Sequence, residues 1–171
     1  MKIQGNYIVL YILLLILQLV ICNYLYISPL LVLTLLPVAV FCLPAELPTV
    51  WAMLIAFVSG LLVDLLGDGL IGLNALAAVP VALARRPLLA SIFGNDVVER
   101  GESISIYKNG LFRIAGALGI VISLFLLVYL FADNAGTRSF WFNLLRFAVS
   151  FPSSLLAGLL CFNALNPKEK R

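Results

Sequence analysis

The stretch Ser59-Gly60-Leu61-Leu62-Val63-Asp64-Leu65-Leu66-Gly67-Asp68-Gly69-Leu70-Ile71-Gly72-Leu73-Asn74-Ala75-Leu76 decides the fold of this chain. It places one carboxylate, Asp64, inside an apolar run and follows it with a glycine-rich turn and a second apolar run. Glycine suits such a turn because it adopts left-handed conformations without steric cost. The pattern predicts a helix, a turn and a second helix. Because a carboxylate within a membrane helix is costly unless something uses it, Asp64 is the first candidate functional residue.

The composition places the chain among integral membrane proteins. Of its 171 residues, 63% are hydrophobic and 11% are charged, and the mean hydropathy is +1.12. A soluble domain of this size needs more polar surface than these residues supply. The apolar runs are long and continuous rather than alternating every second residue, so they predict helices and not the strands of a barrel. The expected fold class is all-α.

Six apolar runs are candidates to cross a membrane, which takes about 20 residues in a helix. They extend from Asn6 to Cys22, Leu25 to Leu43, Leu47 to Leu66, Ile71 to Ala84, Leu111 to Ala132, and Phe140 to Leu165. The fourth is short, and it can continue beyond Arg85-Arg86-Pro87 to Phe93 if the arginines reach the lipid headgroups. No repeat or linker divides residues 1–171, so we expect a single domain, a polytopic bundle of six transmembrane helices.

Positively charged residues indicate the orientation, because Lys and Arg concentrate on the cytoplasmic side of a membrane protein. With the first residue inside and six crossings, Arg138 falls in an outer loop and Arg146 within the last span. The others fall on or near the cytoplasmic side, and they are Lys2, Arg85, Arg86, Arg100, Lys108, Arg113, Lys168, Lys170 and Arg171. Both termini are therefore expected in the cytoplasm. The polar stretch 94–110 becomes a cytoplasmic loop, either simply solvated or used to dock a cytoplasmic partner.

The chain lacks the residues that several chemistries need. It contains no histidine, and Cys22, Cys42 and Cys161 are widely separated in apolar runs. We therefore expect no metal site, no cofactor and no Cys-His nucleophile, and the cysteines fit small packing residues. Ser153 and Ser154 have no lysine neighbour within the bilayer, so no catalytic residue is assigned. No basic patch is interleaved with aromatic residues, which argues against a nucleic-acid partner.

Small residues recur every fourth position in three of the predicted helices. Such stripes let helix backbones approach closely, which matters in lipid because no hydrophobic force drives helices together there. They predict helix-packing faces at Ala52, Ala56 and Gly60, at Ala115, Gly119 and Ser123, and at Ser150, Ser154 and Gly158.

Asp64 and Arg146 are charges within two different spans. Counted along the helical rise from the outer ends of their segments, they lie roughly 3 and 9 Å deep. We expect an intramembrane pair between them as one possibility. Two alternatives stay open: Arg146 can extend outward to the headgroups, and Asp64 can cap the following turn or meet a partner protein.

In length, in its six apolar segments and in the residues around Asp64, the chain resembles the bacterial rod shape-determining protein MreD family. The residues that carry the resemblance are Gly60, Asp64, Gly67, Gly72, Asn74, Ala75 and Leu76, with weaker support from Phe140-Trp141 and Pro152. The stretch 94–110 looks longer than in compact members of that family, which puts the function of this loop in doubt.

The resemblance implies a non-enzymatic scaffold of the cell-wall elongation complex in the bacterial inner membrane. Its partners would be an MreC-like bitopic protein and, directly or through it, a glycosyltransferase and a transpeptidase. The family fold is similar to the S-component of energy-coupling factor transporters, so the alternative function is a substrate-binding subunit of a vitamin transporter. A vitamin pocket needs several convergent polar or aromatic groups, and the sequence offers few.

Overall fold

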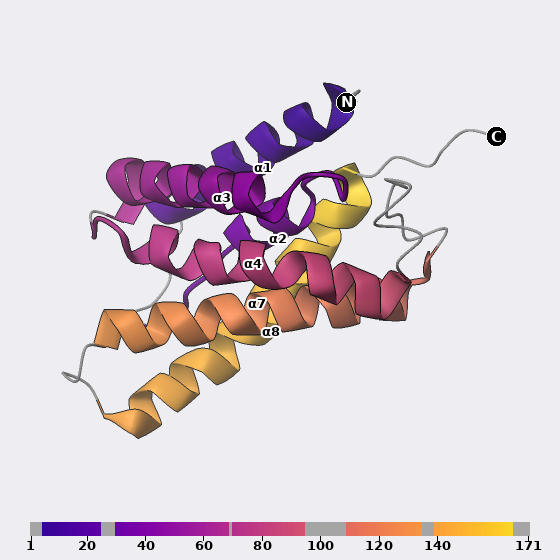
Figure 1. The fold of residues 1–171 in the computed structure, drawn as a ribbon. Helices are drawn as coiled ribbons and strands as arrows, with labels where there is room; N and C mark the ends of the chain where they lie inside the picture. The colour runs from indigo at the N-terminus through magenta and orange to yellow at the C-terminus, as the bar shows by residue number, and fades with distance from the viewer. Residues whose placement is uncertain (1–4, 25–29, 69, 95–108, 135–138, 166–171) are drawn as a thin grey trace.

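The computed structural model describes residues 5–24, 30–68, 70–94, 109–134 and 139–165, and over these it is all-helical (Figure 1). In chain order the elements are α1 (Gly5–Tyr24), α2 (Leu36–Phe41), α3 (Thr49–Val63), the π-helical turn η1 (Asp64–Asp68), α4 (Leu73–Phe93), α7 (Leu111–Asn134) and α8 (Phe140–Leu165). The expected all-α fold class is confirmed. Most of the predicted loop at 94–110, and basic residues such as Arg138 and Lys170, lie outside the described residues.

The long helices pack in the order α3, α4, α7 and α8, each against the next, and α1 contacts α3 and η1. Helix α2 lies at the centre, where it contacts α1, α3, α4 and α7 and has all six residues buried. In Figure 1, η1 and the beginnings of α4 and α8 lie at the left, which we call the η1 end. The beginnings of α1 and α7 and the ends of α4 and α8 lie at the right, the opposite end.

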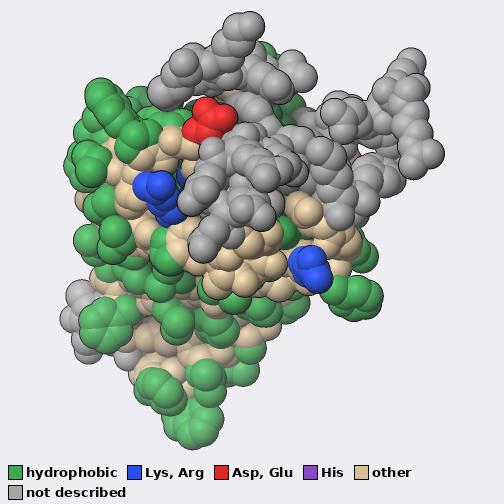
Figure 2. Space-filling model, turned by 45° about the vertical axis from the view of Figure 1, so that its right-hand side comes forward, with side chains coloured by type: hydrophobic (Ala, Val, Ile, Leu, Met, Phe, Trp, Pro, Cys, Tyr) green, Lys and Arg blue, Asp and Glu red, His purple; other side chains and the backbone are tan. Residues whose placement is uncertain are grey.

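The described helices have the length and surface of membrane spans. Four of them are long and apolar enough to cross a membrane, at Thr49–Gly67, Leu73–Phe93, Leu111–Asn134 and Phe140–Asn163, and α1 adds a shorter apolar stretch at Ile8–Tyr24. Large apolar side chains lie exposed on every long helix, and they dominate the face shown in Figure 2. Lipid tails can cover such a surface, whereas water cannot do so without cost. The chain is therefore a helical membrane protein.

The second predicted segment, Leu25 to Leu43, is not one continuous helix, so this part of the prediction is wrong. Residues 31–35 have no regular structure, and only Leu36–Phe41 forms a helix, α2. Pro37 lies in the first turn of α2, where its missing N–H needs no helical partner, so a helix can begin at Leu36 but cannot run through the proline without losing a backbone bond. In the described part of this segment, residues 31–35 therefore form an irregular, partly to fully buried stretch that leads into α2.

Side chains of α8 and α1 satisfy the backbone of this irregular stretch. The Ser150 hydroxyl accepts from the Val32 N–H at 2.9 Å, and the Ser154 hydroxyl accepts from the Thr34 N–H at 3.1 Å. Each serine also donates back to a carbonyl of the stretch, at 3.4 and 3.2 Å. The Gln18 side chain accepts from the Leu35 N–H at 2.5 Å. Irregular backbone at membrane depth is tolerated only with such partners.

The three small-residue stripes therefore have different roles. On α8, Ser150 and Ser154 bind the irregular stretch rather than a helix, and a Cβ on Gly158 would lie 2.8 Å from a methyl of Val38 in α2. On α7, Ala115, Gly119 and Ser123 are only half-buried, and a Cβ on Gly119 would touch the Phe151 ring of α8 at 3.7 Å.

On α3 the stripe faces the interior of the bundle. Ala52 and Ala56 are fully buried, and Gly60 lies directly against the backbone of α4. Close approach of α3 and α4 therefore depends on the absence of a side chain at position 60.

Candidate functional site: the Asp64 junction

Asp64 lies where α3 passes into η1, and its side chain is completely buried. One carboxylate oxygen, Oδ2, accepts from the backbone N–H of Gly72 at 2.9 Å and of Ala75 at 3.3 Å. The other, Oδ1, accepts from the backbone N–H of Asn74 at 3.0 Å and from its side-chain Nδ2 at 2.9 Å. We call Gly60, Asp64, Gly72, Asn74 and Ala75 the Asp64 junction.

These bonds cap helix α4. The first N–H groups of a helix have no intrahelical partner, and an adjacent carboxylate both accepts from them and interacts favourably with the positive end of the helix dipole. The N-cap residue, Gly72, has no side chain to fill this role, and its φ of +95° is one that glycine adopts without strain. Asp64, eight residues earlier, supplies the missing cap.

Gly60 brings the two helices close enough for this cap to form. A Cβ built at this position would lie 2.5 Å from Cα and 2.6 Å from N of Ala75, and 2.9 Å from the carbonyl carbon of Asn74. All three neighbours are backbone atoms, so no side-chain rotation could relieve the contact. Gly60 and Asp64, one helical turn apart on α3, therefore hold the same first turn of α4.

Helix α1 is attached to the same end of the bundle. A Cβ on Gly67 would lie 2.9 Å from Cβ of Cys22, and the Asn23 side chain donates to the carbonyl of Leu66 at 3.1 Å. Gly67 thus serves the contact with α1, while Gly72 has the left-handed conformation that the glycine-rich turn requires. The structure brings Gly60, Asp64, Gly67, Gly72 and Asn74 together at the η1 end.

The expected pair between Asp64 and Arg146 does not form. Arg146 of α8 instead forms an ion pair with Asp133 of α7, through Nη1 and Oδ2. Helices α4 and α7 lie between α3 and α8 in the packing order, which separates the two charges. Asp64 instead accepts hydrogen bonds from residues 72–75 at the start of α4. Of the alternatives, the one in which Asp64 caps the following turn is therefore the one observed.

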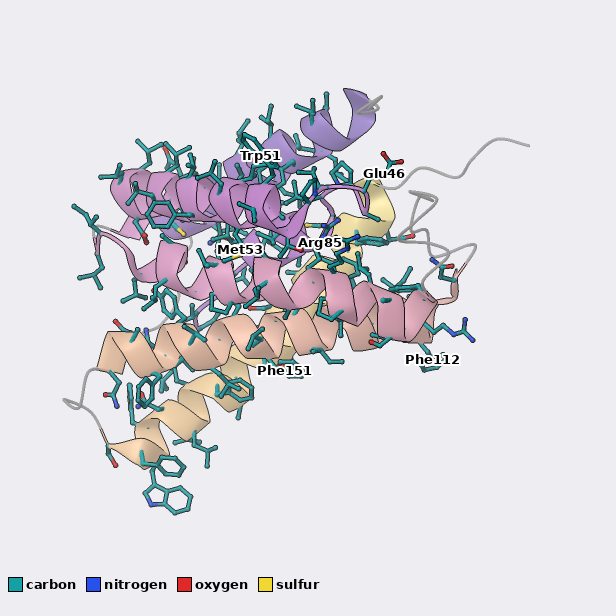
Figure 3. The ribbon with its side chains drawn as sticks, in the orientation of Figure 1. Glu46, Trp51, Met53, Arg85, Phe112 and Phe151 are labelled. Carbon is teal, nitrogen blue, oxygen red and sulfur yellow. The ribbon has the colours of Figure 1, made fainter. Side chains whose placement is uncertain are left out.

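Arg85 is a buried charge whose role the sequence analysis missed. Its side chain points from α4 into the bundle (Figure 3) and is 2% exposed. Nε donates to the Phe41 carbonyl at 3.3 Å, and Nη2 donates to the Leu43 carbonyl. The Phe41 carbonyl is the last of α2 and the Leu43 carbonyl follows just beyond its C-cap, and cations are favourable at the end of a helix. Arg85 therefore caps α2 and does not extend to the headgroups, whereas Arg86 is exposed.

Sequence signals for the missed residues existed but were weak. Gln18 is the one amide in the first apolar run beyond its first residue, Asn6, and Asp133 directly follows the fifth run, 13 positions before Arg146. Neither residue type shows which residue it will bond to, because that depends on which helices are neighbours in the fold. Arg85 looked like part of a basic boundary because Arg86 follows it.

Eight polar side chains of the described residues are at most 2% exposed, and almost all of them are bonded within the bundle. They are Gln18, Thr34, Ser59, Asp64, Asn74, Arg85, Ser150 and Ser154, and only the Thr34 hydroxyl has no hydrogen-bond partner. Groups already bonded to the protein cannot also recognise a ligand at full strength. The Asp64 junction is thus a fully hydrogen-bonded structural link between α3 and α4.

Comparison with known protein families, with characterised proteins and with solved structures finds no match for this chain. Its function must therefore be inferred from its residues and their geometry.

Proposed function

We propose that this protein is a non-enzymatic scaffold of the bacterial cell-wall elongation complex, an MreD-like protein of the inner membrane that binds an MreC-like bitopic partner. The observation that carries the proposal is the Asp64 junction. The main residues on which the resemblance to the MreD family rests, those around Asp64, lie at the η1 end, and the five residues of the Asp64 junction hold α3 and α4 together. Residues that contact one another at one place support a shared function better than the same residues would if they were scattered over the fold.

The junction acts on a partner indirectly. Asp64 and Asn74 are buried, so a partner cannot touch their side chains. The residues that it can touch surround them: Leu65, Leu66, Leu70 and Ile71 are 57%, 59%, 54% and 72% exposed. We infer that the junction fixes the position of this apolar rim, and that the membrane helix of the partner packs against the rim.

The charges of the described residues support an orientation with the η1 end outside. The exposed Arg86 follows Arg85 in the second half of α4, and the exposed Arg113 follows Phe112 at the start of α7, so both belong to the opposite end, where Figure 3 labels Arg85 and Phe112. Lys and Arg favour the cytoplasmic side. The apolar rim then lies near the outer surface, where the extracytoplasmic part of a bitopic partner would begin.

The bonding of the buried polar groups favours a scaffold over a vitamin-transporter subunit. A ligand pocket presents polar groups that are free to bind a small molecule. Here the interior groups Gln18, Asp64, Arg85 and Ser154 bind the protein's own backbone. Because these groups are buried and bonded to the backbone, none of them is open to exchange a proton with a substrate. We therefore propose no enzymatic activity.

Affinity purification from membranes in mild detergent tests the proposal. Co-elution of a single-span coiled-coil protein together with wall synthases supports the scaffold, whereas co-elution of ATPase subunits supports the transporter. A photo-crosslinking residue at Ile71 should capture the single-span protein, and the same residue at Leu160, 62% exposed near the other end of α8, should not. Capture at Leu160 alone would place the interface elsewhere.

A further inference from the structure

Two polar side-chain atoms of α8 are buried without a hydrogen-bond partner. They are Nε of Arg146 and Oδ1 of Asn143, and each has almost no exposed surface and lacks any hydrogen bond. The ion pair of Arg146 with Asp133 lies beside them, with side chains that are 11% and 13% exposed. These two unpartnered atoms are not explained by the helix packing or by the Asp64 junction.

The two atoms are an unpaired donor and an unpaired acceptor on one face of α8. Asn143 and Arg146 are three residues apart, so their side chains emerge on the same side of the helix, separated by about 4.5 Å along its axis. Nε can only donate a hydrogen bond, and the amide oxygen can only accept one. In lipid no bulk solvent can satisfy either atom, so leaving both unpaired is unfavourable.

A single hydroxyl oxygen meets both needs, because it accepts from Nε and donates to Oδ1. A free cation or anion does not, since the charges of Arg146 and Asp133 already balance each other. We propose that Asn143 and Arg146 form a binding site for a neutral hydroxyl ligand, either a water molecule or the hydroxyl of a lipid headgroup.

The position of the site fits this ligand. Asn143 lies in the first turn of α8, next to Phe140 and Trp141, which are 74% and 71% exposed. Large aromatic side chains of this kind mark the level of the headgroups. Water and headgroup hydroxyls are both present at that depth, and Asn143 belongs to the beginning of α8, which lies at the η1 end. Buried waters typically bridge such otherwise unsatisfied groups.

Thiol accessibility tests the proposal. In a background with Cys22, Cys42 and Cys161 replaced, Asn143→Cys is compared with Leu144→Cys, which lies at the same depth but is 46% exposed on the helix surface. A hydroxyl ligand that reaches the site from the headgroup layer needs a path open to small polar molecules, whereas Leu144 faces lipid. Because a small hydrophilic reagent reacts with the thiolate, which lipid disfavours, Asn143→Cys should react at least about tenfold faster than the control. Equal rates for the two variants would overturn the proposal.

The lipid composition identifies the ligand. Similar rates in phosphatidylcholine and phosphatidylglycerol liposomes indicate water, whereas slower reaction in phosphatidylglycerol, whose headgroup carries hydroxyls, indicates a lipid hydroxyl. Both results support the site.

A second variant gives an independent test by the sign of its effect. Asn143→Leu removes the acceptor with little change in volume. If a hydroxyl ligand is bound, thermal stability should fall because a ligand bond is lost. If Oδ1 is truly unpaired, stability should rise because a costly buried acceptor is removed, and this result would contradict the proposal.

Discussion

Gly60→Ala is the smallest substitution that should separate α3 from α4. The new methyl group would lie 2.5 Å from Cα of Ala75, whereas ordinary van der Waals contact begins at 3.4 Å. Relief of the contact requires the backbones to move apart by about 0.9 Å (3.4 minus 2.5), which also lengthens the hydrogen bonds of Asp64 to the first turn of α4. Overpacking of a core costs about 1–3 kcal/mol. Because only backbone atoms are in the way, we expect a loss in the upper part of that range, about 2–3 kcal/mol.

The chain offers a matched control and an intermediate. A Cβ at Gly116 of α7 meets nothing within 4 Å, so Gly116→Ala should stabilise by about 0.5–1 kcal/mol through its higher helix propensity. At Gly158 the closest atom, 2.8 Å away, is a methyl of Val38 that can move, so Gly158→Ala should fall between the two. The expected gap between the extreme variants is therefore about 2.5–4 kcal/mol.

Unfolding of the purified variants in mixed micelles, followed by circular dichroism as SDS is increased, measures this order. The account predicts that Gly60→Ala unfolds first, Gly158→Ala next and Gly116→Ala last. A Gly60→Ala protein as stable as Gly116→Ala would refute the close approach of α3 and α4 and, with it, the geometry of the Asp64 junction.

Three further substitutions test the buried polar contacts by the same unfolding measurement. Asp64→Asn places an amide NH₂ against backbone donors, and leaving two of them unpaired should cost at least about 2 kcal/mol. Ser154→Ala removes two bonds to the irregular stretch and should cost about 1–3 kcal/mol, whereas Ser153→Ala, which loses bonds only within α8, should be nearly neutral. Arg85→Gln should lose about 1.5–3 kcal/mol for each charged hydrogen bond, and the exposed Arg86→Gln should change little. If Ser154→Ala were as stable as Ser153→Ala, or Arg85→Gln as stable as Arg86→Gln, the corresponding contacts would not stabilise the fold. An Asp64→Asn protein as stable as the wild type would contradict the capping role of Asp64.

The helices could be predicted from the sequence where local pattern decides the structure. Continuous apolar runs gave α1, α3, α7 and α8 close to their observed bounds, and the optional continuation of the fourth run through Arg85-Arg86-Pro87 is realised in α4. The cluster around Asp64 could also be anticipated, because the donors that bind the carboxylate lie only eight to eleven residues further along the chain.

The remaining features depend on residues that are distant in sequence. The sequence of the irregular stretch before α2 is apolar and predicts a membrane-spanning helix. The serines that satisfy its backbone lie 118 and 120 positions away. Likewise, nothing in the local pattern shows that Arg146 lies beside Asp133 and not Asp64, since this follows from the order in which the helices pack. Side-chain patterns predict elements, whereas pairings of buried charges need the three-dimensional neighbours.

Quantitative co-purification measures whether the Asp64 junction is needed for this protein to bind a single-span partner. Tagged wild-type protein, Asp64→Asn and the exposed control Glu46→Gln are purified from membranes, and the partner is measured by mass spectrometry relative to the tagged chain. The account predicts a coiled-coil, single-span partner with the wild type and with Glu46→Gln, and several-fold less of it with Asp64→Asn at equal insertion. The same amount of partner with all three proteins would contradict the proposed role of the junction.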